Sequence, residues 1–213
     1  MAEPTSGKVT LTKSAPTVSL SKSAAAGGVM RVNLNWTARP AGAPSGGFLK
    51  KLLGGSDSAA IDLDLACLYE LSNGDKGVVQ ALGNSFASDP GPKPVIRLDG
   101  DDRSGTNTEG ENLFIDLSQL ALVRRVLVFA FIYEGVANWG AADAVVTLHP
   151  QEGPPVEVRL DEHAANASMC AVALLENSGG ELVVRREVRY VSKGHKELDS
   201  AYGWGLNWTA GRK

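Results

Sequence analysis

The chain has 213 residues, of which 43% are hydrophobic and 21% charged, so it can bury a core and is neither a disordered tail nor a coiled coil. Twenty-one basic side chains against 24 acidic ones give a net charge of -3, which argues against nucleic acid as the main partner, because phosphate binding needs a basic surface. Two cysteines are too few to cross-link the fold, which is typical of a protein from a reducing compartment. The longest apolar run, from Val126 to Tyr133, is too short for a membrane span. We therefore expect a cytoplasmic protein without a secretory signal.

Apolar residues alternate with polar ones along most of the chain, which is the period of a half-buried β-strand. Short strands are expected at residues 9–14 and 18–23, and a third strand where Met30, Val32, Leu34 and Trp36 alternate with polar residues. The segment 37–60 is rich in glycine and proline and shows no alternation, so we expect a flexible insertion there.

The alternation becomes more regular from residue 61 onward. In residues 61–71 the apolar side chains share one face of a strand, and Asp62, Asp64 and Glu70 lie on the other. The uninterrupted apolar run from Val126 to Tyr133 predicts a central strand covered on both faces. The remaining strands are expected at residues 76–82, 95–98, 112–117, 144–148, 156–160, 169–175 and 182–190. About ten strands with few helical patterns predict one all-β domain over residues 1–213, a two-sheet β-sandwich of mostly antiparallel strands.

Acidic residues are densest between residues 99 and 111. Five carboxylates alternate there with three glycines and several small polar residues. Such a loop can aim carboxylates and backbone carbonyls at one point, as a calcium ion with six to eight oxygen ligands requires. The spacing does not match an EF-hand. The alternative is an acidic turn that is simply solvated. The candidate ligands are Asp99, Asp101, Asp102, Glu109 and Glu111.

Asp62 and Asp64 project from the same face of one strand, where two like charges repel unless something positive lies near them. If the sandwich places this strand beside the acidic loop, the pair completes a cation site. A strand face that is open to water is the alternative.

Catalytic motifs are absent from the sequence. The histidines at 149, 163 and 195 are expected in turns or at strand ends, and both cysteines are expected in the core. Tyr202, Trp204 and Trp208 near the end of the chain either close the core or form a binding platform, for instance for a carbohydrate.

Several segments together resemble a known family: Val-Ser-Leu-Ser-Lys from residue 18, Asp62-Leu63-Asp64-Leu65, residues 100–105 (GDDRSG) and the closing Tyr202-Gly203-Trp204-Gly205. They are similar to the TerD family of bacterial tellurium-resistance and stress-response proteins. Three longer stretches, IDLDLACLYEL, VLVFAFIYEG and SMCAVALLEN, are similar to its TerA-like branch, and the resemblance covers nearly the whole chain.

This resemblance implies a calcium-binding β-sandwich that is not an enzyme. By position, the implied ligands are Asp101 and Asp102, then Glu109 and Glu111, then Asp62 and Asp64. Two features depart from the family pattern. Residues 110–113 carry one carboxylate where the family usually has three, and the segment 37–60 has no counterpart in the short loop expected there.

We therefore expect a non-catalytic, calcium-binding stress-response module that acts through other stress-response proteins. The alternatives are a carbohydrate-binding or other ligand-binding sandwich that uses the C-terminal aromatic residues, and a structural scaffold without metal.

Overall fold

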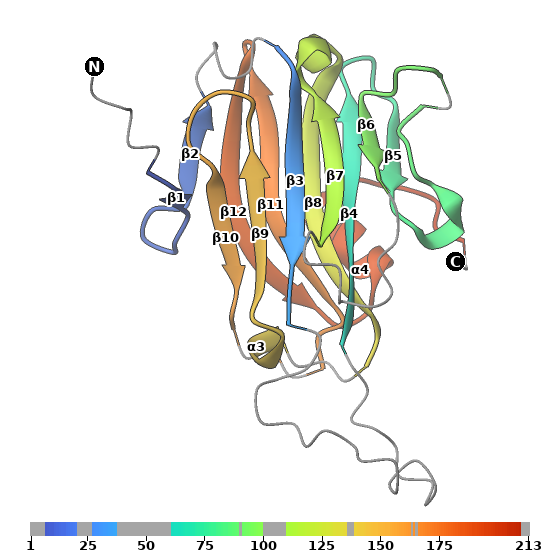
Figure 1. Ribbon diagram of the computed structural model, residues 1–213. Helices are drawn as coiled ribbons and strands as arrows, with labels where there is room; N and C mark the ends of the chain where they lie inside the picture. Colours follow the sequence, from blue (N-terminus) through green and yellow to red (C-terminus); the bar gives the residue numbers. More distant parts are fainter. Residues whose placement is uncertain are drawn as a thin grey trace, which may run out of the picture.

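The computed structural model describes residues 7–20, 27–37, 61–89, 91–99, 110–135, 139–162, 164 and 166–209. Twelve strands in these ranges form two six-stranded sheets that lie one behind the other (Figure 1). The predicted all-β sandwich is therefore confirmed. Of the expected insertion at 37–60, residues 38–60 lie outside the described part of the chain.

The strands of each sheet come from distant parts of the sequence, and only β1, which runs parallel to β10, departs from antiparallel pairing. The first sheet has the order β1 (Val9–Thr10), β10 (Val156–Leu160), β9 (Ala144–His149), β3 (Val29–Asn35), β7 (Glu111–Asp116) and β6 (Ile96–Leu98). The second sheet has the order β2 (Thr17–Leu20), β12 (Glu181–Val191), β11 (Met169–Ser178), β8 (Val123–Glu134), β4 (Asp62–Leu71) and β5 (Lys76–Val79). Strands β1 and β5 are shorter than the alternation predicted, and residues 21–23 of the second expected strand lie outside the described ranges.

Strand β8 is the interior strand that its apolar run predicted, with β11 on one side and β4 on the other. Alternate side chains of β8 point to opposite faces of the sheet. Val126 and Val128 pack in the core between the two sheets, whereas Leu127 and Phe129 pack in a second cluster. Both faces of the second sheet are thus buried along β8.

Within the described ranges, four short helices accompany the sheets: η1 (Leu82–Asn84), η2 (Leu117–Leu122), α3 (Trp139–Ala142) and α4 (His195–Tyr202). The expectation that His195 lies in a turn or at a strand end is wrong, because this residue begins α4. Only Leu198 and Asp199 are buried in that helix, so its apolar stripe is too short to show a helical period in the sequence. No helix within the described ranges is long and apolar enough to cross a membrane.

Helix α4 and the chain that follows it cover the outer face of the second sheet, and Figure 1 shows α4 behind that sheet. Leu198 and Trp204 from this cover pack on Leu68 and Phe129 of the sheet. Trp204 is 1% exposed, and its indole N–H donates a hydrogen bond to the carbonyl oxygen of Tyr69. Trp204 therefore closes the core, and the alternative that it forms part of an exposed platform is wrong.

Glu70 on β4 holds this cover through a charge network. Its side chain is 3% exposed and accepts hydrogen bonds from Arg124 and Arg125 at 2.6 and 2.7 Å. Burial alone raises the pKa of Glu70, but the hydrogen bond and charge of Arg125, aided by Lys76 and Arg124, hold it below its usual value. The guanidinium of Arg125 also lies 3.9 Å from the centre of the Trp204 ring, and Lys76 donates to the Trp204 carbonyl oxygen.

His195 is packed among aromatic rings at the start of α4. Its ring lies edge-on to Phe129 and Phe131 and 4.8 Å from the ring centre of Trp208, and its Nε2 is 2.9 Å from Oε1 of Gln80. Because burial disfavours the charged imidazolium, the pKa of His195 is lowered to about 4.

We predict that Glu70→Gln lowers the free energy of unfolding by about 2 kcal/mol or more, because charge-assisted hydrogen bonds are lost and three cations remain close together. Urea unfolding measures this change. The matched control is Glu176→Gln, because Glu176 on β11 is exposed and lies opposite Arg125 of β8. The free energy of unfolding of this variant should stay within about 0.5 kcal/mol of that of the parent. Equal loss in both variants would contradict the role assigned to Glu70.

We also predict an acid-sensitive fold. The unfolded chain takes up a proton on His195 near pH 6.5, whereas the folded chain resists protonation down to about pH 4, so stability falls as the pH decreases through this window. The expected loss is about 2 kcal/mol between pH 7 and pH 5. In His195→Gln, which cannot titrate, the pH dependence of urea unfolding should be flatter by this amount. An unchanged pH dependence would remove His195 as its source.

Candidate metal centre

The first half of β4 carries two buried carboxylates at an edge of the second sheet. Strand β5 pairs only with residues 67–70 of β4, so in the described ranges no strand adjoins Asp62 or Asp64 on that side. Asp62 is nevertheless 7% exposed and Asp64 is fully buried. The alternative that these residues lie on a strand face open to water is therefore wrong.

Glu111 brings a third buried carboxylate to the same edge from the other sheet. It is the first residue of β7 and is 2% exposed. Its Oε2 accepts a hydrogen bond from the backbone N–H of Leu65, the residue after Asp64, at 2.6 Å. The sandwich thus places the β4 edge beside the C-terminal end of the acidic segment, which is the arrangement that the sequence analysis named as the condition for a cation site.

The two ends of the acidic segment are held together by Asp99 and Asn112. The carboxylate of Asp99 accepts hydrogen bonds from the backbone N–H and the side-chain amide of Asn112, and the Asp99 N–H donates to the Asn112 carbonyl oxygen. Asn112 in turn accepts from Nδ2 of Asn33 on β3 at 2.9 Å. Asp99 therefore serves as an anchor at the base of the segment.

Gly110 explains how the chain passes from the segment into β7. Its φ is +63°, a conformation that residues with a Cβ rarely adopt. A Cβ at this position would also collide with the carbonyl oxygen of Leu34. Only glycine fits this close approach to β3, which sets Glu111 in place against β4.

The predicted ligands thus divide into three groups. Asp62, Asp64 and Glu111 are buried at the β4 edge, Asp99 lies at the base of the segment, and the rest lie outside the described residues: Asp101, Asp102 and Glu109. Among the described residues no three Asp, Glu, His or Cys side chains are grouped so that they could hold a metal ion by themselves. The available donors are all carboxylate oxygens, which are the ligands that calcium prefers.

Sequence reasoning missed the residues that support these carboxylates. Asn112 and Asn33 were read only as polar positions of two strands, yet they pair directly across β3 and β7. An asparagine that alternates with core residues on each of two strands is the signal that was available. The sequence did not show that these two strands are neighbours in the sheet.

Other reactive side chains lie in the core or at strand ends. Cys67 and Cys170 are free thiols and fully buried, as predicted, and burial raises the pKa of both. His149 ends β9, again as predicted, and its pKa is lowered by burial and by the charge of Arg31. His163 lies outside the described residues.

Comparison with known proteins supports the resemblance noted in the sequence. No protein-family model matches the chain. The tellurium resistance protein TerA of Alcaligenes sp. is 45% identical over 206 residues, which cover 97% of this chain and 58% of that protein, so the chain spans a little over half the length of this relative.

Two crystal structures share the fold. One is the protein of unknown function SAV2460, with a TM-score of 0.57 and 15% identity, covering 81% of this chain and 95% of that one. The other is a homologue of the telluride resistance protein TerD, SCO6318 from Streptomyces coelicolor A3(2), with a TM-score of 0.53 and 19% identity, covering 82% and 95%. The resemblance noted in the sequence is therefore confirmed: over 97% of its residues the chain is similar to a tellurium resistance protein, TerA, and it shares its fold with a TerD homologue.

Proposed function

We propose that this protein is a non-catalytic, calcium-binding module of the tellurium-resistance type, which acts in the cytoplasm through other stress-response proteins. The observation that carries the metal proposal is the burial of Asp62, Asp64 and Glu111 at one edge of the sandwich, beside the base of an acidic segment. The tellurium-resistance role is supported by the identity to TerA.

The described carboxylates supply one side of the proposed site. Asp64 and Asp62 come from β4 and Glu111 from β7, so each is fixed by a strand within a sheet. The remaining oxygen ligands are assigned to Asp101, Asp102 and Glu109, because residues 99 and 112 hold both ends of their segment at this edge. A bound calcium ion would supply the positive charge that offsets repulsion among these groups.

The non-catalytic part of the proposal is supported by where the nucleophiles lie. Both thiols are buried with raised pKa values, so neither is available as a thiolate at neutral pH. The described histidines, His149 and His195, both have lowered pKa values because of burial.

We predict that Glu111→Gln weakens calcium binding by about tenfold or more, because it removes one charged ligand while the amide oxygen can still accept the Leu65 N–H. Isothermal titration calorimetry measures the affinity. Glu157→Gln is the matched control, since Glu157 is also buried and lies in the same sheet on β10, and it should bind calcium as the parent does.

Millimolar calcium should also raise the melting temperature of the parent relative to chelator. A ligand that binds only the folded state adds about 2.7 kcal/mol at 100 times its dissociation constant. A melting temperature that does not move, together with no calorimetric signal, would favour the metal-free scaffold instead.

A further prediction concerns partners. Ordering an acidic, glycine-rich segment costs conformational entropy, so the surface beside it should be presented to a partner mainly in the metal-bound state. Affinity capture from a lysate of the source cells is carried out once with calcium and once with chelator. The parent protein should recover partners when calcium is present and should recover none when chelator is present. The double variant Asp101→Asn, Asp102→Asn should lose both calcium and partners.

The control for this experiment removes two exposed charges elsewhere, in Asp161→Asn combined with Glu176→Gln. It should recover the same partners as the parent. Recovery that persists in the Asp101, Asp102 variant after calcium is lost would show that the metal is structural and does not control partner binding.

A further inference from the structure

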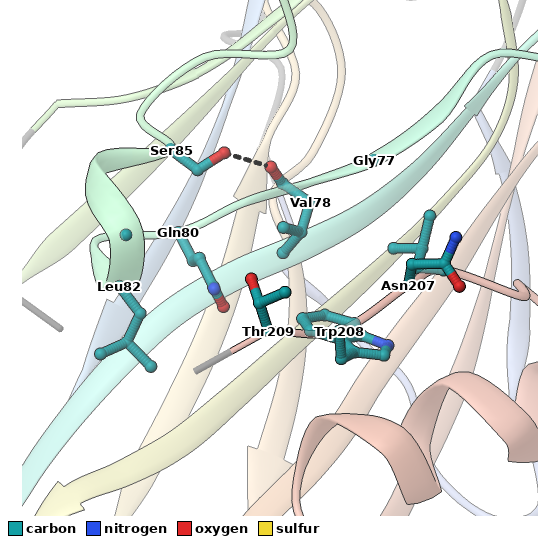
Figure 2. A pocket seen from close by; sticks show the side chains of 10 residues that line it. Gly77, Val78, Gln80, Leu82, Ser85, Asn207, Trp208 and Thr209 are labelled. Atoms are coloured by element: carbon teal, nitrogen blue, oxygen red, sulfur yellow. Dashed lines mark hydrogen bonds between the residues drawn. The ribbon is translucent and has the colours of Figure 1, made fainter. Parts of the chain in front are cut away.

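A groove surrounds Trp208 on the outer face of the second sheet. One hollow of about 300 Å³ lies between the chain at 206–209 and the β5–η1 region, where Val78, Gln80 and Leu82 line it. Figure 2 shows Trp208 and Thr209 beside these side chains. A second hollow, of about 460 Å³, adjoins the first, because Gln80, Leu82, Trp208 and Thr209 line both, and we call the two together the groove.

The indole of Trp208 is held in place within this groove. Its Nε1–H donates a hydrogen bond to Oδ2 of Asp199 at 3.1 Å, and its ring lies against the ring of His195. Asp199 is 5% exposed and also accepts the backbone N–H groups of Gly205 and Leu206. Because the indole is fixed before any ligand arrives, stacking on it costs little side-chain entropy. Trp208 is only partly buried, in contrast with Trp204.

The second hollow ends at two lysines. Lys193 precedes α4 and Lys196 lies in its first turn, and both are exposed. Neither ammonium group takes part in an ion pair with any residue that the structure describes. Lys76, by comparison, pairs with Glu70, and Lys8 with Glu157. Glu197, which follows Lys196 in α4, accepts the backbone N–H of Lys193, and this hydrogen bond and the charge of Lys193 help to lower the pKa of Glu197. The groove therefore joins an aromatic surface to two exposed cations that have one carboxylate beside them.

We propose that the groove around Trp208 binds a small molecule in which a planar aromatic ring carries an anionic group, of the size of a mononucleotide. The ring stacks on Trp208 beside the apolar side chains of Val78 and Leu82, and the anion lies at Lys193 and Lys196. Gln80 lines both hollows, and because its Oε1 is hydrogen-bonded to Nε2 of His195, only its amide NH2 group is offered to polar atoms on the ring. This inference goes beyond the proposed calcium site and does not depend on it.

The test uses three probes that separate the two halves of the ligand. Adenosine monophosphate has both ring and anion, adenosine has the ring alone, and inorganic phosphate has the anion alone. Titrations followed by calorimetry and by NMR of the Trp208 indole N–H should show saturable binding of adenosine monophosphate and binding at least about tenfold weaker for the other two. Its affinity should fall with added salt, because the lysines are exposed.

Two variants assign the binding to this groove. Trp208→Leu should weaken adenosine monophosphate binding by about tenfold, the loss expected when one stacking surface is removed. Lys193→Gln combined with Lys196→Gln changes exposed side chains only, so the fold should be kept, and binding should fall to the level of adenosine. The matched control is Lys93→Gln, an exposed lysine that does not line the groove, and it should bind as the parent does.

No saturable binding of adenosine monophosphate at millimolar concentration would overturn the proposal. So would equal binding of phosphate alone, since the aromatic ring would then contribute nothing. Affinity that is unchanged in the double lysine variant would also overturn it, whether or not Trp208→Leu folds.

Discussion

Burial of the second sheet on both faces is the constraint on which the rest of this structure depends. Strands β4 and β8 carry apolar side chains on both faces, so packing against the first sheet covers only half of them. The outer half, which includes Leu68 and Phe129, needs a second cover. Helix α4 and the chain up to Trp208 provide it, and the charge network of Glu70 and Arg125 holds this cover on the sheet.

The same constraint explains how three acidic residues on one strand come to be buried. Asp62, Asp64 and Glu70 alternate with core residues on β4, and all three are buried in the folded protein. At the Glu70 end, three cations accompany the carboxylate. At the other end a further carboxylate, that of Glu111, reaches the strand. Burying a charge costs free energy unless the charge is paired or coordinated. Cationic side chains pair with the carboxylate at the Glu70 end of β4, and the proposed calcium ion would coordinate the carboxylates at the other end.

The two proposed sites are built from different residues and use different chemistry. The metal site is built from strands of both sheets, with the Asp99 and Asn112 contacts and Gly110 setting its position. The groove around Trp208 is built by the cover of the second sheet, and its indole is fixed by Asp199 and His195. Within the described ranges no residue of one proposed site lines the other. Phe131 lies between them, since it is opposite Asp64 in the sheet and its ring contacts His195.

The sequence by itself determined the β-sandwich class, most strand positions and the interior place of β8, because alternation with period two and an uninterrupted apolar run are local signals. It also placed Cys67 and Cys170 in the core. Only the tertiary structure decided that Glu111 contacts Leu65, since residues 46 positions apart meet through the packing of two sheets. It likewise decided that His195 starts a helix and that Trp204 is buried while Trp208 lines a groove. The spacing of the two tryptophans in the chain does not show which one is buried, because burial depends on the surface that each one covers.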